Sequence, residues 1–138
     1  MSESKPSFRP ARQITESEGD EAVSSGDLER IRYALIDGSR CLDDAWTIRH
    51  AWALTAHSDA GIRWAAVFAI DQARSTWVPS LVNDFEPIHV LDRLVTNDPD
   101  ASVRGMVATT MTDVISMLVS ALRPEEDAEP DAAADGGA

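Results

Sequence analysis

The sequence predicts a small all-α domain built from two copies of a helix pair. Between residues 27 and 123, apolar residues recur at the three-to-four spacing of amphipathic helices. The chain shows neither the apolar–polar alternation of half-buried strands nor an Asn-Gly or Asp-Gly turn between β-branched runs. Two segments also match each other at a fixed offset, which indicates an internal repeat.

Composition divides the chain into three parts. Residues 1–26 are rich in Ser, Glu, Gly and Asp, and residues 124–138 contain only Ala, Asp, Glu, Pro and Gly. Neither end carries enough apolar side chains to offset the entropy of ordering, so we predict that both are disordered. The remaining residues, 27–123, are the predicted helical domain.

About five helices are expected in this domain. The first begins after an N-cap at Asp27 and ends at Gly38. The second covers residues 42–57 and the third residues 58–75, with Ser58-Asp59 as its cap. A linker that contains a further helical turn is predicted to follow.

The last two helices are separated by the sequence Asn-Asp-Pro-Asp. The fourth begins within residues 84–87, and the fifth begins with Asp98 as N-cap and Pro99 as its first residue, ending before Pro124. The predicted apolar stripe of the fifth helix consists of Val103, Val107, Met111, Val114, Leu118 and Leu122.

The internal repeat relates residues 54–70 to residues 95–111 at an offset of 41. In each copy a helix ends, an Asp-containing turn follows, and an apolar-Arg dipeptide lies one turn into the next helix. A period near forty with two helices in each unit is typical of a helical solenoid.

This pattern resembles the HEAT-repeat family over residues 42–122, through Asp59 and Ile62-Arg63 in one unit and Asp100 and Val103-Arg104 in the other. The resemblance implies a short HEAT-like α-solenoid in which these arginines tie the turns of adjacent repeats together. Each arginine also follows an aspartate by four positions, the spacing of an i,i+4 pair. We therefore expect structural roles for Asp59, Arg63, Asp100 and Arg104. The second copy departs from the family pattern at Gly105, Thr109 and Thr110.

Two repeats are few, because stacked units need neighbours to bury both of their faces. The first helix is predicted to cap one end of the stack. The other end would be closed by the long fifth helix, by a degenerate repeat or by a partner chain, and self-association is one of the alternatives.

Charge and hydropathy narrow the function classes. The net charge is −12, and the last fifteen residues hold six acidic and no basic side chains, which disfavours nucleic-acid binding. The sequence contains no run of 18 apolar residues, so it predicts no membrane span. The polar N-terminus lacks a secretory pattern and Cys41 is the single cysteine, so we predict a cytoplasmic protein.

Candidate catalytic and metal-binding residues fit their chemistry poorly. His50, His57 and His89 lack the spacing of three or four that metal-binding helices use. Cys41 has no catalytic signature around it, and no nucleophile elbow or phosphate-binding glycine loop is found. We predict no catalysis, no cofactor and no metal.

One tryptophan stands apart from the predicted core. Trp64 points about 160° away from Ile62 around its helix, whereas Trp46, Trp52 and Trp77 fit buried positions. In HEAT-like proteins the second helix of each unit lines the concave surface, so the resemblance places Trp64 at a binding face. The predicted contact residues on the two units are Trp64, Asp71, Arg74, Thr109, Thr112 and Ser116.

These observations predict a non-catalytic adaptor, scaffold or inhibitor that binds another protein. Two alternatives remain open. The first is a HEAT-like enzyme or enzyme accessory of the lyase or DNA-glycosylase type, and the second is a structural subunit of a larger assembly.

Overall fold

The computed structural model describes residues 12–123, and every regular element in this range is helical, which confirms the all-α prediction there. There are seven α-helices rather than five, together with one 3₁₀ turn. They are α1 (Glu16–Val23), α2 (Leu28–Cys41), α3 (Asp44–Leu54), α4 (Ala60–Gln72), α5 (Arg74–Trp77), η1 (Pro79–Val82), α6 (Glu86–Asn97) and α7 (Ala101–Ala121). None of these helices has the length and apolar character that a membrane span requires.

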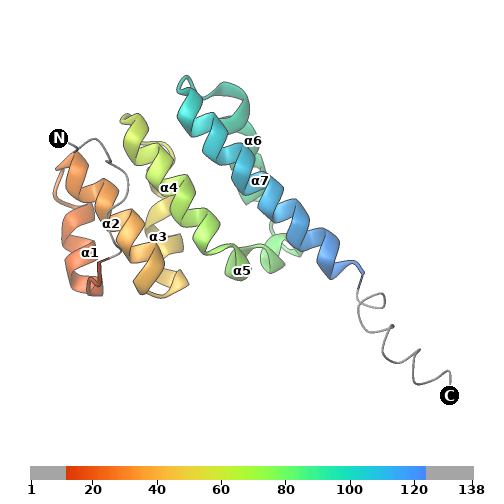
Figure 1. Cartoon of the computed structure of the whole chain (residues 1–138), viewed down its shortest axis with the longest axis horizontal. Helices are drawn as coiled ribbons and strands as arrows, with labels where there is room; N and C mark the ends of the chain where they lie inside the picture. The colour runs from red at the N-terminus through yellow and green to blue at the C-terminus, as the bar shows by residue number, and fades with distance from the viewer. Residues whose placement is uncertain (1–11, 124–138) are drawn as a thin grey trace, which may run out of the picture.

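The long helices form three pairs, α1 with α2, α3 with α4, and α6 with α7 (Figure 1). The second helices of the pairs lie side by side, with α4 between α2 and α7. Two ion pairs show that α4 and α7 run in the same direction: Arg63 meets Asp98 at their beginnings, and Arg74 meets Asp113 farther along. One pair more than the sequence repeat indicates is therefore present.

Helix α4 is the centre of the core because its side chains are small. Ala65, Ala66, Ala69 and Ala73 are fully buried, and such short side chains let neighbouring helices approach closely. Larger side chains from the surrounding helices fill the remaining space. They include Leu35 from α2, Leu91 from α6, and Val103 and Val107 from α7.

Aspartates begin all three second helices. Asp27, Asp59 and Asp100 each accept hydrogen bonds from free backbone N–H groups of the following turn. The prediction that Asp98 caps the last helix is wrong. Asp98 instead ends α6, and its carboxylate accepts a hydrogen bond from Arg63 on α4.

The prediction of disorder up to residue 26 is also wrong for part of that segment. Thr15 and Glu18 form a capping box that starts α1, and Gly19 and Ala22 are buried. The helix is held by Asp20, which accepts a 2.9 Å hydrogen bond from Nε1 of Trp46. The predictions of disorder for residues 1–11 and 124–138 concern residues outside the described range.

Gly38 was predicted to end the first expected helix, which corresponds to α2. It instead lies buried within α2, which continues to Cys41. Its missing side chain makes room for the ring of Trp46, which also lies against Gly19 on α1. Trp46 therefore fills the space where α1, α2 and α3 meet. The linker between the second and third pairs contains α5 and η1, and Trp77 within it is buried, as predicted.

We expect the substitution Gly38→Ala to lower the free energy of unfolding by about 1–2 kcal/mol, although alanine favours helix. An added Cβ would collide with the Trp46 ring. Gly105→Ala is the matched control, because a Cβ there meets nothing within 4 Å and should stabilise the protein by up to about 1 kcal/mol. Urea unfolding followed by circular dichroism measures both, and equal effects would contradict this packing.

Candidate functional site

Each helix pair has a turn between its two helices, and the same type of hydrogen bond occurs in all three turns. In each, the N–H of the capping aspartate donates to the side chain two residues earlier. The acceptors are Ser25 for Asp27, His57 for Asp59 and Asp98 for Asp100, at 3.1, 2.9 and 2.9 Å. The first turn escapes the sequence repeat because it precedes the second by 32 residues, rather than 41, and has Ile31 rather than an arginine four residues after its cap.

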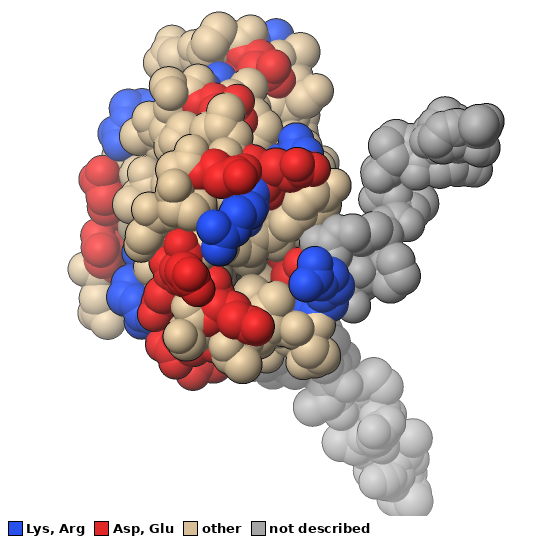
Figure 2. Space-filling view, turned by 90° about the vertical axis from the view of Figure 1, so that its left-hand side faces the viewer, with Lys and Arg blue, Asp and Glu red and all other residues tan. Residues whose placement is uncertain are grey.

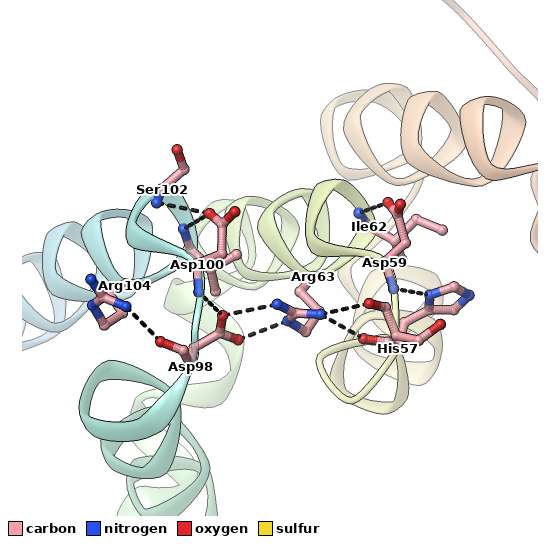
Figure 3. Close-up of polar contacts among 10 residues, drawn as sticks. His57, Asp59, Ile62, Arg63, Asp98, Asp100, Ser102 and Arg104 are labelled. Atoms are coloured by element: carbon pink, nitrogen blue, oxygen red, sulfur yellow. Dashed lines mark hydrogen bonds and ion pairs between the residues drawn. The ribbon is translucent and has the colours of Figure 1, made fainter.

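Arg63 ties the turn of the second pair to the turn of the third (Figure 3). Its Nε and Nη2 donate to the two carboxylate oxygens of Asp98 at 2.7 and 2.9 Å, and Nη1 donates to the carbonyls of His57 and Ser58. The expected i,i+4 pair with Asp59 is not the observed bond. The carboxylate of Asp59 faces the N–H of Ile62 and caps α4.

The tie is electrostatically strong because both side chains are nearly buried. The hydrogen bonds from Arg63 lower the pKa of Asp98, and the carboxylate in turn raises the pKa of Arg63. A two-pronged guanidinium–carboxylate contact also fixes orientation, so it sets how α4 and α7 lie relative to each other.

Arg104 repeats half of this arrangement. Its Nη1 donates to the carbonyl of Asp98 at 2.7 Å, as Nη1 of Arg63 does to His57. Among residues 12–123, Nε and Nη2 of Arg104 have no hydrogen-bond partner, because no further turn follows α7 in this range.

Asp71 and Arg74 belong to the junction between α4 and α7. Nη1 of Arg74 donates to Asp71 at 2.9 Å and lies 3.8 Å from a carboxylate oxygen of Asp113. Burial, and then the hydrogen bond with Asp113, raise the pKa of Asp71. Asp71 is only 6% exposed, so we reassign it from the predicted contact surface to the packing of the two helices.

Trp64 lies on the partly exposed side of α4, where it stacks on Phe68. The two rings are 5.6 Å apart with planes 10° from parallel, and the guanidinium carbon of Arg40 lies 5.4 Å from the centre of the Phe68 ring. Phe68 and Arg40 are not among the contact residues that the sequence predicts. The spacing of four between Trp64 and Phe68 is the signal that would have found the aromatic pair.

The predicted contact residues of α7 are all exposed. The hydroxyls of Thr109 and Thr112 donate to carbonyls of their own helix, at 3.1 and 3.0 Å, and Ser116 follows one turn later. By the repeat, Gly105 and Thr109 are the counterparts of Trp64 and Phe68. The second helices therefore present a bulky aromatic pair on α4 and small side chains at the equivalent positions of α7.

The His, Cys and acidic side chains of the described residues do not gather into a metal site. Within residues 12–123, no three His, Cys, Asp or Glu side chains cluster as metal ligands would. Sγ of Cys41 lies 3.4 Å from the backbone nitrogen of Ile14, and His50 meets Asp20.

Basic charge is dispersed. Several arginines of the described range pair with acidic residues, for example Arg49 with Glu16 and Arg93 with Glu86. Figure 2 shows basic side chains interspersed with acidic ones on the face that it presents. No continuous basic surface is present on that face.

Comparisons with protein-family models, curated proteins and solved structures give no match. The resemblance to HEAT repeats therefore rests on the residues of this chain alone.

We expect Asp98→Asn to lower the free energy of unfolding by about 2–3 kcal/mol at pH 7, because charge-assisted bonds to Arg63 are lost. The pKa of Asp98 is lower in the folded state, so this contribution is complete above its ordinary pKa and disappears as the pH falls toward the folded value.

Urea unfolding at pH 7 and at successively lower pH tests this. The difference between wild type and variant should shrink below about pH 4. Asp92→Asn, at an exposed position of α6, serves as the control and should change stability by less than about 0.5 kcal/mol. A difference that is constant with pH would contradict the role of the charge.

Proposed function

We propose that this chain is a non-catalytic protein-binding module that contacts its partner through the exposed side of α4 and α7. The observation that carries the proposal is the stacked pair of Trp64 and Phe68, partly exposed beside Arg40. Aromatic and arginine side chains are the residue types that contribute most to protein interfaces.

The neighbouring surface of α7 supports this proposal. Gly105, Thr109, Thr112 and Ser116 are small and exposed, and the space beside Gly105 is open. A partner helix or strand can approach closely over such residues while it covers the Trp64 ring. The hydroxyls already donate within their own helix, so close contact leaves few polar groups without a partner.

We also propose that the three helix pairs are a short HEAT-like solenoid in the cytoplasm. The side-by-side second helices, the repeated turn bond and the Arg63 tie favour the solenoid. A DNA-glycosylase type of enzyme would need a basic stripe. The pairing of the arginines with acidic residues argues against that alternative, and no specific observation favours a lyase.

The sharpest test is Gly105→Arg. An arginine there adds bulk to the proposed contact surface without entering the core, and it removes a helical glycine, so the variant should remain folded. With a partner captured from the native host and then purified, titration calorimetry should show binding at least about tenfold weaker, equivalent to about 1.4 kcal/mol.

Trp64→Ala should give a similar loss of affinity. Phe85→Ala is the matched control, since Phe85 is also a largely exposed aromatic residue but lies in the turn before α6. Wild-type affinity for both Gly105→Arg and Trp64→Ala, with circular dichroism spectra like that of wild type, would reject this surface.

A further inference from the structure

The outer edge of α7 carries a second exposed feature, which we call the end stripe. It consists of residues spaced alternately by four and three positions: Arg104, Ala108, Met111, Ile115, Leu118 and Leu122. Leu118 and Leu122 were predicted to be core residues but are 40% and 80% exposed, and Ile115 is 58% exposed. The helix lies at the opposite edge of the stack from α1 (Figure 1), so its outer side has no neighbour among the described residues.

The internal repeat identifies the end stripe as a face that is covered in the preceding unit. Within the repeat, the counterparts of Ala108 and Met111 are Val67 and Ile70 on α4, and both are buried. Because the third helix pair follows α4, Val67 and Ile70 are covered, whereas on α7 Ala108 is exposed and Met111 is only partly buried.

The remaining segments of this chain are poor candidates to cover the stripe. Residues 124–138 contain no apolar side chain larger than proline. Residues 1–11 join the structure at Arg12, whose N–H donates to Asp37 on α2, and α4 lies between α2 and α7. Neither segment of this sequence is therefore a good match for the apolar stripe.

The end stripe has the pattern of a helix that packs against a copy of itself. Its spacing is that of the a and d positions of a heptad, with Ile115 at a and Leu118 at d. No charged residue lies between Asp113 and Arg123, so two copies present no like charges to each other there. We propose that α7 packs against α7 of a second copy in an antiparallel, two-fold symmetric contact.

Antiparallel packing pairs small with large side chains along the stripe. When a positions meet d positions, Met111 lies opposite Ile115 of the second copy, and Ala108 lies opposite Leu118 of the second copy. With Arg104 opposite Leu122, six layers extend over about 27 Å of helix.

The charge of Arg104 favours the antiparallel direction, in which the two Arg104 side chains lie at opposite ends of the contact. Helical side chains tilt toward the N-terminus of their own helix, which here points past Leu122 of the second copy. A parallel contact would instead place the two Arg104 side chains against each other.

Light scattering of the full chain tests the contact. We expect a particle of twice the 15.0 kDa chain mass at high micromolar concentration. Leu118→Glu should raise the dissociation constant about 100-fold, because an unpaired charge enters the apolar seam, while circular dichroism stays unchanged. Ser120→Glu, which adds the same charge to an exposed position off the stripe, should leave the dimer intact.

The proposal would be overturned if the wild-type chain remained monomeric at a concentration of about 200 μM. A mass that grows beyond the dimer with concentration would also overturn it, since a two-fold contact closes on itself. These outcomes leave the Trp64 surface untouched, because Leu118→Glu and Gly105→Arg alter different sides of α7.

Disulfide trapping tests the direction of the helices in a Cys41→Ser background. A mixture of the Ala108→Cys and Leu118→Cys chains should oxidise to a mixed dimer at least tenfold faster than either variant alone forms its own, because only the opposed positions come within disulfide reach. Rapid oxidation of each variant with itself would indicate parallel helices and overturn the arrangement.

Discussion

The arrangement of the last two helix pairs depends on the guanidinium group of Arg63. It joins the turn before α4 to the turn before α7 through bonds to the backbone of one and to the carboxylate of Asp98 in the other. Because this contact is two-pronged and nearly buried, it fixes both the distance and the direction of the two helices. Arg74 repeats the constraint farther along, with Asp71 and Asp113.

Two separate surfaces result from this alignment. With α4 and α7 side by side and in register, one common side of the helices carries Trp64 and Phe68 on α4 and small residues on α7. The outer edge of α7 carries the end stripe, in which Ala108 and Met111 are the counterparts of buried residues of α4. The first surface combines bulky and small side chains, and we propose that it binds a different protein. The second is apolar, and we propose that it packs against a copy of itself.

The repeat also separates structural arginines from available ones. Arg63 and Arg104 occupy equivalent positions and make the same backbone bond, but only Arg63 has a carboxylate from a following turn. Arg63 thus joins two turns in the interior of the stack, whereas Arg104 at its end has donors without a partner among residues 12–123. This explains why residue type alone is a poor guide to which arginine contacts a partner.

The sequence by itself determined the helical class, the caps at Asp27 and Asp59, and the equivalence of Arg63 with Arg104, because periodicity, capping and short-range repeats act within a few residues. It did not determine that Asp98 serves Arg63, that Asp71 is buried, or that Gly38 lies under Trp46.

It also missed α1, whose capping box at Thr15 and Glu18 was visible in a segment of otherwise polar composition. That helix contacts Trp46, whose indole donates a 2.9 Å hydrogen bond to Asp20, 26 residues away in the sequence. Each of these features depends on which side chains from distant parts of the chain meet. Local pattern specifies where helices begin and which side is apolar, but only the packing of whole helices decides which aspartate, glycine or leucine is covered.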